Sequence, residues 1–356
     1  MIKNRLLISI TIGIAVLLSA GGVLFFSGCT GGAAYVLSGT LYIGGYSTEK
    51  IYVVDLGDTA TIESIDLPTG AQPDWLTLSP DKTKLYCSSY DNYMVYIINT
   101  VTNEYEKEVA NVCTGPRGIA FTPDGTIAAV VCNGGGDVAL IDTATGTYNN
   151  NSADTIPYMS DSGEKYGIAI HPTLNKCYVT SGTKIMYGDV SPGATMTETY
   201  SIISSGIYDV EVSSDGSRVY SSALITDPVL GETVVTLSVN GGSGALSQVD
   251  TAECVSNNLT KLRLSPDQNK VYVPMESLSA IDYMNTADTS TMTSIDLTSY
   301  AQSGVKDVVF SADSKKAFVV IDSTTDSIIV IDTATGTVDE QITLPDCNPK
   351  SLVFKQ

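Results

Sequence analysis

The stretch that decides the fold is VFSADSKKAFVVIDSTTDSIIVIDTATGTVDEQITLP, residues 309–345. Short β-branched and aromatic runs alternate in it with clusters of Asp, Ser, Thr and Gly. Such runs are typical of β-strands, and such clusters are typical of tight turns. The segment therefore predicts successive antiparallel strands, and four strands in fewer than fifty residues are the usual content of one propeller blade.

The same unit recurs along the chain, and it can be phased on the turn expected between the first and second strands of each blade. Successive copies of this turn lie 42 to 52 residues apart and predict six blades with a complete first hairpin. The six turns are Ser79–Asp81, Thr122–Gly125, His171–Thr173, Ser213–Gly216, Ser265–Asp267 and Ser311–Asp313.

The two ends of the repeat region supply a seventh blade. Leu41–Tyr46 reads as a second strand that lacks a first strand before it, and Ser351–Phe354 reads as a first strand with nothing after it. Pairing the two would close the ring and leave no exposed sheet edge between the first and last repeats. We therefore expect an all-β fold, a seven-bladed β-propeller over residues 39–356.

A second signature marks the end of the third strand. The heptapeptide Ile141–Thr147 is repeated letter for letter at Ile331–Thr337, and its Asp and Gly suit a turn with a side-chain cap and a positive φ. With the runs Lys176–Ser181 and Lys270–Pro274, these turns resemble the YVTN-type β-propeller repeat family. That resemblance implies a surface-layer or periplasmic propeller, and it is informative for fold rather than for activity.

The first 38 residues have the features of an export signal followed by a short linker. Lys3 and Arg5 precede an apolar run from Leu6 to Phe26, and Phe26–Cys29 resembles the cleavage site of a bacterial lipoprotein signal. We expect a signal peptide over residues 1–28, lipidation of Cys29 and a flexible tether over residues 29–38. The apolar run is also long enough to remain as an uncleaved transmembrane helix. Both alternatives place the propeller outside the cytoplasmic membrane, anchored to it.

Charge narrows the choice of partners. The chain carries 39 Asp and Glu against 19 Lys and Arg, a formal net charge of −20. Such an acidic protein repels phosphate backbones, so we exclude nucleic acid as a partner.

Polar residues at the start of the inner strands are the candidates for a binding site. The turn phasing places them on one face, around the opening of the central channel, where propellers commonly hold ligands. This pore-mouth ring consists of Asp74, Arg117, Tyr166, Tyr208, Asp209, Lys261, Asp307 and Lys350, with Lys306 beside Asp307. Trp75, the only Trp, is expected to pack between blades.

Motifs for known chemistry are absent from the sequence. His171, the only histidine, falls in a turn on the face opposite the ring, where we expect it to be exposed to solvent. A single His in a turn argues against a Ser-His-Asp triad or a His-based zinc site. We therefore predict no catalytic residue, no metal site and no cofactor, although a divalent cation could bind at the ring.

Six cysteines follow Cys29, an even number that permits disulfides outside the cytoplasm. Folding the hairpin around Asp124 and Gly125 brings Cys132 opposite Arg117, close to Cys113, so we predict a Cys113–Cys132 disulfide. Cys87 and Cys177 fall inside second strands and are expected to be buried thiols.

Three functional hypotheses remain. The leading one is a non-enzymatic scaffold at the cell envelope that binds an envelope or surface-layer protein. The alternative is a lactonase-like or other cation-dependent hydrolase that uses the pore-mouth ring. The third, a redox accessory role, depends on the cysteines alone.

Overall fold

The computed structural model describes residues 37–57, 60–148, 155–157, 167–201, 204–225, 231–254, 259, 261–301 and 303–356. The predicted signal peptide, Cys29 and the part of the predicted tether before Leu37 lie outside these residues. Within the described residues there is no helix long and apolar enough to cross a membrane.

The described residues form seven sheets of four antiparallel strands each. From the inner to the outer strand, the sheets are β28 (Pro349–Lys355), β1 (Gly39–Gly45), β2 (Lys50–Leu56) and β3 (Thr61–Asp66); β4 (Trp75–Leu78), β5 (Lys84–Ser89), β6 (Met94–Asn99) and β7 (Glu104–Val109); β8 (Pro116–Phe121), β9 (Ile127–Cys132), β10 (Asp137–Asp142) and β11 (Thr155–Pro157); β12 (Ile168–Ile170), β13 (Lys176–Ser181), β14 (Lys184–Asp189) and β15 (Thr197–Ser201); β16 (Ser204–Val212), β17 (Arg218–Ile225), β18 (Gly231–Val239) and β19 (Leu246–Glu253); β20 (Arg263–Leu264), β21 (Lys270–Met275), β22 (Ala280–Asn285) and β23 (Asp288–Asp296); β24 (Val305–Phe310), β25 (Lys316–Ile321), β26 (Ser327–Asp332) and β27 (Val338–Thr343).

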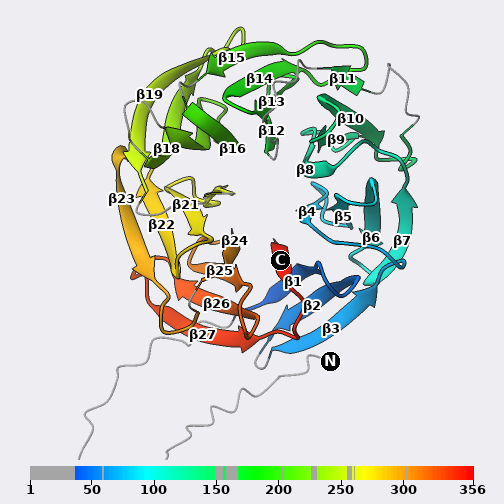
Figure 1. Cartoon of the computed structure of the whole chain (residues 1–356), viewed down its shortest axis with the longest axis vertical. Helices are drawn as coiled ribbons and strands as arrows, with labels where there is room; N and C mark the ends of the chain where they lie inside the picture. Colours follow the sequence, from blue (N-terminus) through cyan, green and yellow to red (C-terminus); the bar gives the residue numbers. More distant parts are fainter. Residues whose placement is uncertain are drawn as a thin grey trace, which may run out of the picture. The chain divides into compact units, whose positions relative to one another are not determined.

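The seven sheets stand in a ring as the blades of a propeller (Figure 1). Their inner strands surround a central channel, which is lined in part by Trp75, Ile119 and Val308. The ring closes as the sequence predicts, because β28 at the C-terminus pairs antiparallel with β1, with Thr40 opposite Lys355 and Tyr42 opposite Val353. The seven-bladed fold and its mode of closure are therefore confirmed.

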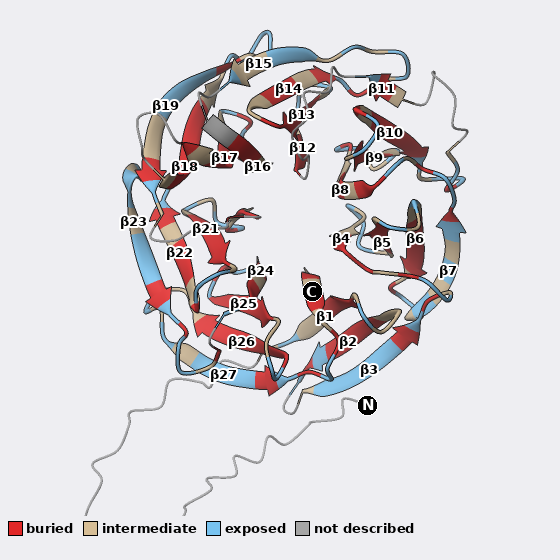
Figure 2. Ribbon diagram, in the orientation of Figure 1, coloured by how far each residue is buried: buried red, intermediate tan, exposed pale blue. Residues whose placement is uncertain are grey.

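Burial follows the position of each strand within its blade (Figure 2). The second and third strands are apolar runs that are buried on both faces, as in Lys84–Ser89 and Met94–Asn99. The outer strands carry charged and hydroxylated residues and are largely exposed, as in Glu104–Val109. Middle strands can be apolar throughout because a neighbouring blade covers each of their faces.

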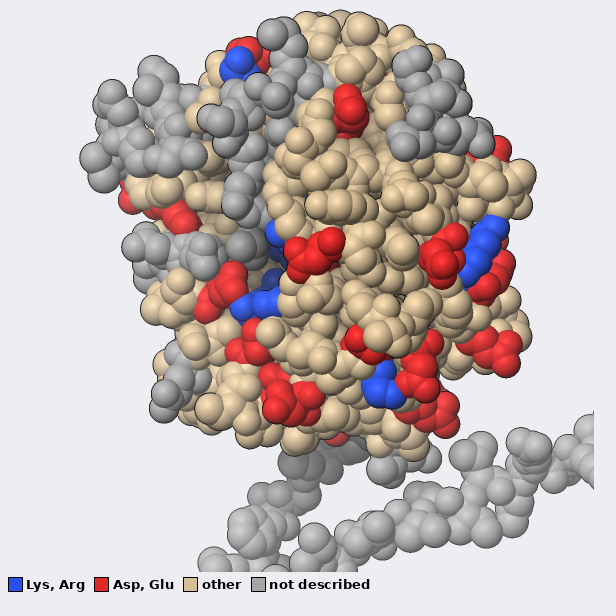
Figure 3. Space-filling view, turned by 45° about the vertical axis from the view of Figure 1, so that its right-hand side comes forward, with Lys and Arg blue, Asp and Glu red and all other residues tan. Residues whose placement is uncertain are grey.

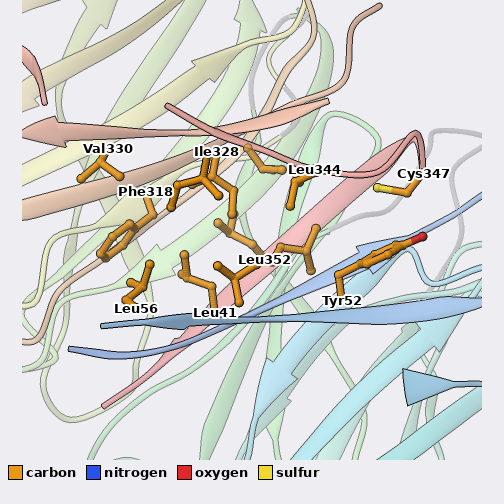
Figure 4. Close-up of a cluster of buried hydrophobic side chains, with 13 residues drawn as sticks. Leu41, Tyr52, Leu56, Phe318, Ile328, Val330, Leu344, Cys347 and Leu352 are labelled. Carbon is orange, nitrogen blue, oxygen red and sulfur yellow. The ribbon is translucent and has the colours of Figure 1, made fainter. Parts of the chain in front are cut away.

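The apolar core is divided into layers between adjacent blades. In one layer, Phe318 and Ile328 of the last blade pack against Leu41 and Leu352 of the closing blade (Figure 4). Because Leu352 and Leu41 come from opposite ends of the chain, this layer adds hydrophobic burial to the backbone pairing that closes the ring.

The Asp-containing turns have the predicted chemistry. The Asp81 carboxylate accepts hydrogen bonds from the Ser79 hydroxyl at 2.6 Å and from the Thr83 amide at 3.0 Å. In the repeated heptapeptide, the Asp142 carboxylate accepts from the Thr145 amide at 2.8 Å, and Gly146 has a φ of 58°. Many carboxylates therefore cap turns. Asp and Glu side chains are spread over the surface seen in Figure 3.

His171 does not lie exposed in its turn, contrary to the sequence-based expectation. Its side chain is buried, and its Nδ1 accepts a hydrogen bond from the Leu174 amide at 2.9 Å. Nε2 therefore carries the ring proton and donates it to the Gly216 carbonyl at 3.0 Å. The turn of the next blade covers the imidazole, a contact between blades that the local sequence does not reveal.

Candidate functional site

A cavity of about 330 Å³ opens at one mouth of the central channel. The residues that surround it stand at the ends of inner and second strands of several blades. They are Tyr46, Asp74, Trp75, Arg117, Lys261, Glu276, Lys306 and Lys350. We call this space the mouth cavity. Four residues of the predicted ring line it, namely Asp74, Arg117, Lys261 and Lys350.

Irregularities in the strand pairing determine which side chains reach the mouth cavity. The β24–β25 register shifts between Val305 and Asp307, and the β8–β9 register shifts between Pro116 and Ile119. Lys306 and Arg117 lie in these shifted segments, and both line the cavity. The shifts interrupt the regular alternation of side chains between the two faces of the sheet. β-Bulges commonly redirect side chains at functional sites in this way.

Two ion pairs line the wall of the mouth cavity. Arg117 pairs with the Asp74 carboxylate, and its guanidinium lies 4.3 Å from the ring centroid of Tyr90. Lys306 pairs with Glu276, and its Nζ also lies 3.4 Å from an Asp322 carboxylate oxygen. These contacts hold the carboxylates of Asp74 and Glu276 at the edge of the cavity.

Lys350 is the cation at the mouth with the weakest ion pair. Its Nζ lies 3.8 Å from an Asp322 carboxylate oxygen, at the outer limit of an ion pair, and 5.6 Å from the Tyr46 ring centroid. Burial and the nearby charge of Lys306 lower the pKa of Lys350, although Asp322 and Glu276 oppose this. Two ammonium groups held close together favour an anion between them, because it relieves their repulsion.

A second layer of charges lies beneath the cavity and joins three blades. The Asp307 carboxylate is fully buried and accepts hydrogen bonds from Lys261 Nζ at 3.0 Å and from the Ser351 hydroxyl at 3.0 Å. Arg263 lies between Asp307 and Asp209, at 3.3 Å and 3.4 Å from their carboxylate oxygens. Burial alone would raise the pKa of Asp307, but the charges of Arg263 and Lys261 hold it below its usual value.

Trp75 separates the mouth cavity from the rest of the channel. Its ring lines both the mouth cavity and a larger cavity of about 560 Å³ among the inner strands. Lys261 Nζ lies 4.6 Å from the Trp75 ring centroid, and the Arg263 guanidinium lies 5.2 Å from it. The expectation that Trp75 packs between blades was therefore incomplete, because this residue also forms a floor held by two cations from across the channel.

Two carboxyl groups below that floor have raised pKa values. Burial raises the pKa of Asp209 to about 6, even though Arg263 favours its charged form. Burial also raises the pKa of Glu211 to about 7, and the charges of Asp209 and Asp307 add to the effect. Both side chains face the larger cavity rather than the mouth cavity.

The predicted ring is thus only partly assembled at the mouth. Asp307 and Asp209 are buried beneath it, and Tyr166 lies outside the described residues. Tyr208 packs against the apolar layer that contains Tyr220 and is not among the residues that line the mouth cavity.

Sequence reasoning missed three residues of this region. Glu276 follows a second strand and Tyr46 follows β1, whereas the predicted ring drew only on the starts of inner strands. Arg263 begins the short strand β20, two residues beyond Lys261, which was the ring residue chosen in that segment. A charged residue directly after an apolar second strand, as in Met275–Glu276, was the one available signal.

The three ring aspartates that the structure describes are paired with cationic side chains. In the part of the chain that the structure describes, no three His, Cys, Asp or Glu side chains gather as metal ligands. Asp74, Asp209 and Asp307 are each paired with Arg or Lys instead. Their geometry therefore fits a salt-bridge network better than divalent coordination.

Four of the described cysteines lie as the sequence predicts. Cys113 and Cys132, the pair expected from the hairpin, form a disulfide with their Cα atoms 5.6 Å apart. Cys87 and Cys177 are buried in β5 and β13, as expected. Burial raises the pKa of the Cys177 thiol to about 12, so thiolate chemistry is suppressed there.

Comparison with known proteins places the chain among seven-bladed propellers. The family model described as "Lactonase, 7-bladed beta-propeller" matches residues 40–110. No curated protein matches the chain.

Solved structures share the fold over most of the chain. A candidate 6-phosphogluconolactonase from Bacteroides uniformis is 17% identical, with a TM-score of 0.70 over 88% of this chain and 98% of its own. The periplasmic gluconolactonase of Pseudomonas aeruginosa is 16% identical, with a TM-score of 0.70 over 89% and 99%. Hydrazine synthase of Kuenenia stuttgartiensis is 18% identical, with a TM-score of 0.62 over 86% and 92%.

These findings correct the leading functional hypothesis. The non-enzymatic scaffold was the wrong choice, because the matching family model and several structural neighbours carry lactonase names. They favour the lactonase-like alternative.

Proposed function

We propose that the protein hydrolyses a lactone in the mouth cavity, as a lactonase-like enzyme. The observation that carries this proposal is the grouping of Arg117, Lys306 and Lys350 with the carboxylates of Asp74 and Glu276 around one cavity of about 330 Å³. The match of residues 40–110 to a lactonase family model supports it.

The cations suit both the substrate and the transition state. Attack on a lactone carbonyl places negative charge on the carbonyl oxygen, and fixed positive groups stabilise that oxyanion. Lys350 and Lys306 are the groups assigned to this role, since their mutual repulsion is relieved when an anion lies between them. The same cations would bind a lactone that carries a negative substituent, in spite of the net charge of −20 on the chain.

Asp74 is the proposed base, because it is the only one of the three predicted ring aspartates that lines the cavity. A water oxygen bonds to the carbonyl carbon while the water proton passes to the Asp74 carboxylate. The ring C–O bond then breaks, and the leaving oxygen takes the proton from Asp74, so that a hydroxy acid is released. Arg117 orients Asp74 through their ion pair.

This mechanism uses lysines where the sequence suggested a divalent cation. Binding of a divalent cation at the pore-mouth ring stays a prediction. If the lysines perform the reaction, a chelator will leave the rate of hydrolysis unchanged.

The test is hydrolysis of glucono-δ-lactone and its 6-phosphate, followed by acid release and corrected for spontaneous ring opening. We expect Asp74→Asn to lower kcat by about 10²-fold or more. Asp313→Asn, at a turn on the opposite face, is the matched control and retains wild-type activity. Wild-type protein that does not accelerate opening of any lactone would contradict the proposal.

We also propose that the enzyme works outside the cytoplasmic membrane as a lipoprotein of the YVTN-type family. The motif around Cys29 and the Cys113–Cys132 disulfide support this location, because disulfides persist in oxidising compartments. Cys29→Ser should abolish incorporation of a labelled lipid and release the protein from the membrane fraction. Retention of the variant in the membrane would favour the uncleaved helix. The envelope partner stays a prediction.

A further inference from the structure

A second pocket of about 290 Å³ adjoins the mouth cavity, and Tyr46 lines both. The pocket lies between the β1–β2 turn and the segments that enter β4 and β28. Its lining residues are Tyr46, Ser47, Glu49, Gly70, Ala71, Gln72 and Asn348. We call it the side pocket.

The same two segments supply walls to both spaces. Gln72 lines the side pocket and Asp74, two residues later, lines the mouth cavity. Asn348 and Lys350 repeat this arrangement at the start of β28. Tyr46 therefore stands between the two spaces, and a ligand long enough to fill both would pass its ring.

The two spaces differ in chemistry. Ammonium and guanidinium groups dominate the mouth cavity, whereas the side pocket contains amide groups, a hydroxyl and the carboxylate of Glu49. No Lys or Arg lines the side pocket. A ligand that fills both would need an anionic or carbonyl end and an uncharged end rich in hydrogen-bond donors.

Two amides of the side pocket have unused hydrogen-bonding capacity. Gln72 Oε1 and Asn348 Oδ1 are buried and accept no hydrogen bond from the described residues. A buried oxygen without a hydrogen-bond partner is unfavourable, so a ligand hydroxyl that donates to it would be stabilising. The terminal torsion of an amide side chain has a broad energy profile, so each group can turn its polar end toward a ligand at low cost.

Hydrogen bonds position the backbone of Gln72 and Asn348 and the side chain of Tyr46. The Gln72 amide N–H donates to the Ser89 hydroxyl at 3.0 Å, and the Asn348 N–H donates to the Asp326 carboxylate at 3.0 Å. The Tyr46 hydroxyl donates to the Asp91 carboxylate at 2.9 Å. Such a fixed aromatic wall between polar groups suits a sugar ring, whose C–H face packs on the aromatic ring while its hydroxyls bond to the amides.

We infer that the side pocket is a glycosyl subsite, which makes the preferred substrate a lactone that carries a second sugar unit. This inference rests on the proposed lactone hydrolysis in the mouth cavity. The lactone lies among Lys306, Lys350 and Asp74, and the attached sugar lies beyond Tyr46 against Gln72 and Asn348. Hydroxyl groups suit these amides because a hydroxyl both donates and accepts hydrogen bonds.

Calorimetric binding of two product analogues tests the subsite without requiring turnover. Gluconate has one sugar unit, and lactobionate is an aldonate with an additional hexose. We expect wild-type protein to bind lactobionate about tenfold more tightly than gluconate. Gln72→Ala and Asn348→Gly should each remove most of that preference and leave gluconate affinity unchanged. Glycine is chosen at 348 because Asn348 has a φ of 50°.

Gln248→Ala, on the exposed outer strand β19, is the matched control and should retain the preference. If both aldonates bind equally well, or if the pocket variants weaken both equally, the subsite is overturned while the proposed hydrolysis stands. If neither aldonate binds and no lactone is opened, the subsite and the proposed function fall together.

Discussion

The Asp307 carboxylate accepts a hydrogen bond at 3.0 Å from the ammonium group of Lys261, a residue of the adjacent blade. Both side chains are buried, and Lys261 also donates to the Lys350 carbonyl at 2.9 Å. Two charges that the sequence suggested as ligand-binding groups thus serve first to join neighbouring blades beneath the mouth cavity.

Asp307→Asn should therefore act on stability more than on the surface of the cavity. Removing one charge of a buried ion pair leaves the other without compensation, so we expect the free energy of unfolding to fall by about 3 kcal/mol. Urea denaturation measures this loss. Asp66→Asn, which breaks the exposed pair with Lys50, should have a much smaller effect, because solvent screens that pair. Equal effects of the two substitutions would contradict the structural role of Asp307.

Stability should decrease with pH because of Asp209 and Glu211. Their folded pKa values, about 6 and about 7, exceed the usual unfolded values of about 3.9 and 4.3. The folded protein therefore binds more protons than the unfolded chain in this range, and the contribution of these groups to stability is lost as pH rises from about 4.5 to 7.5.

Urea denaturation across that range, with the wild type and Glu211→Gln, tests this prediction. The variant cannot titrate at position 211, so its free energy of unfolding should fall less steeply with pH. A wild-type curve that rises steadily from pH about 5 to 7 would show that other groups outweigh this pair.

Lys306→Gln should weaken the binding of anions at the mouth. The substitution removes one of the two ammonium groups proposed to hold the oxyanion, so we expect kcat/KM for an anionic lactone to fall about tenfold or more. It should also make the rate less sensitive to salt. Lys315→Gln, at an exposed site on the opposite face, is the control and should leave both quantities unchanged. If kcat/KM is unchanged in Lys306→Gln, then Lys306 does not bind the oxyanion.

Breaking the Cys113–Cys132 disulfide should destabilise the third blade. The bridge closes a loop with a sequence separation of 19, for which loop entropy predicts about 3 kcal/mol. Comparing chemical denaturation of the wild type with and without a reductant measures this loss. Cys132→Ser should match the reduced wild type and be insensitive to the reductant. A reductant effect that persists in this variant would point to a different bridge.

The sequence by itself determined the architecture. Seven blades and their closure were predicted from local patterns. These are the spacing of the repeats, the turn residues, and the unpaired strands at Leu41–Tyr46 and Ser351–Phe354. The Cys113–Cys132 pairing was accessible for the same reason, because one short hairpin brings the two residues together.

Only the tertiary structure decided which side chains share a space. Lys306 lies at a register shift and lines the mouth cavity, and a bulge leaves no reliable mark in a β-rich sequence. The burial of His171, the Arg263 bridge and the side pocket all depend on contacts between different blades. Such contacts bring together residues far apart in the chain, so no local pattern determines them.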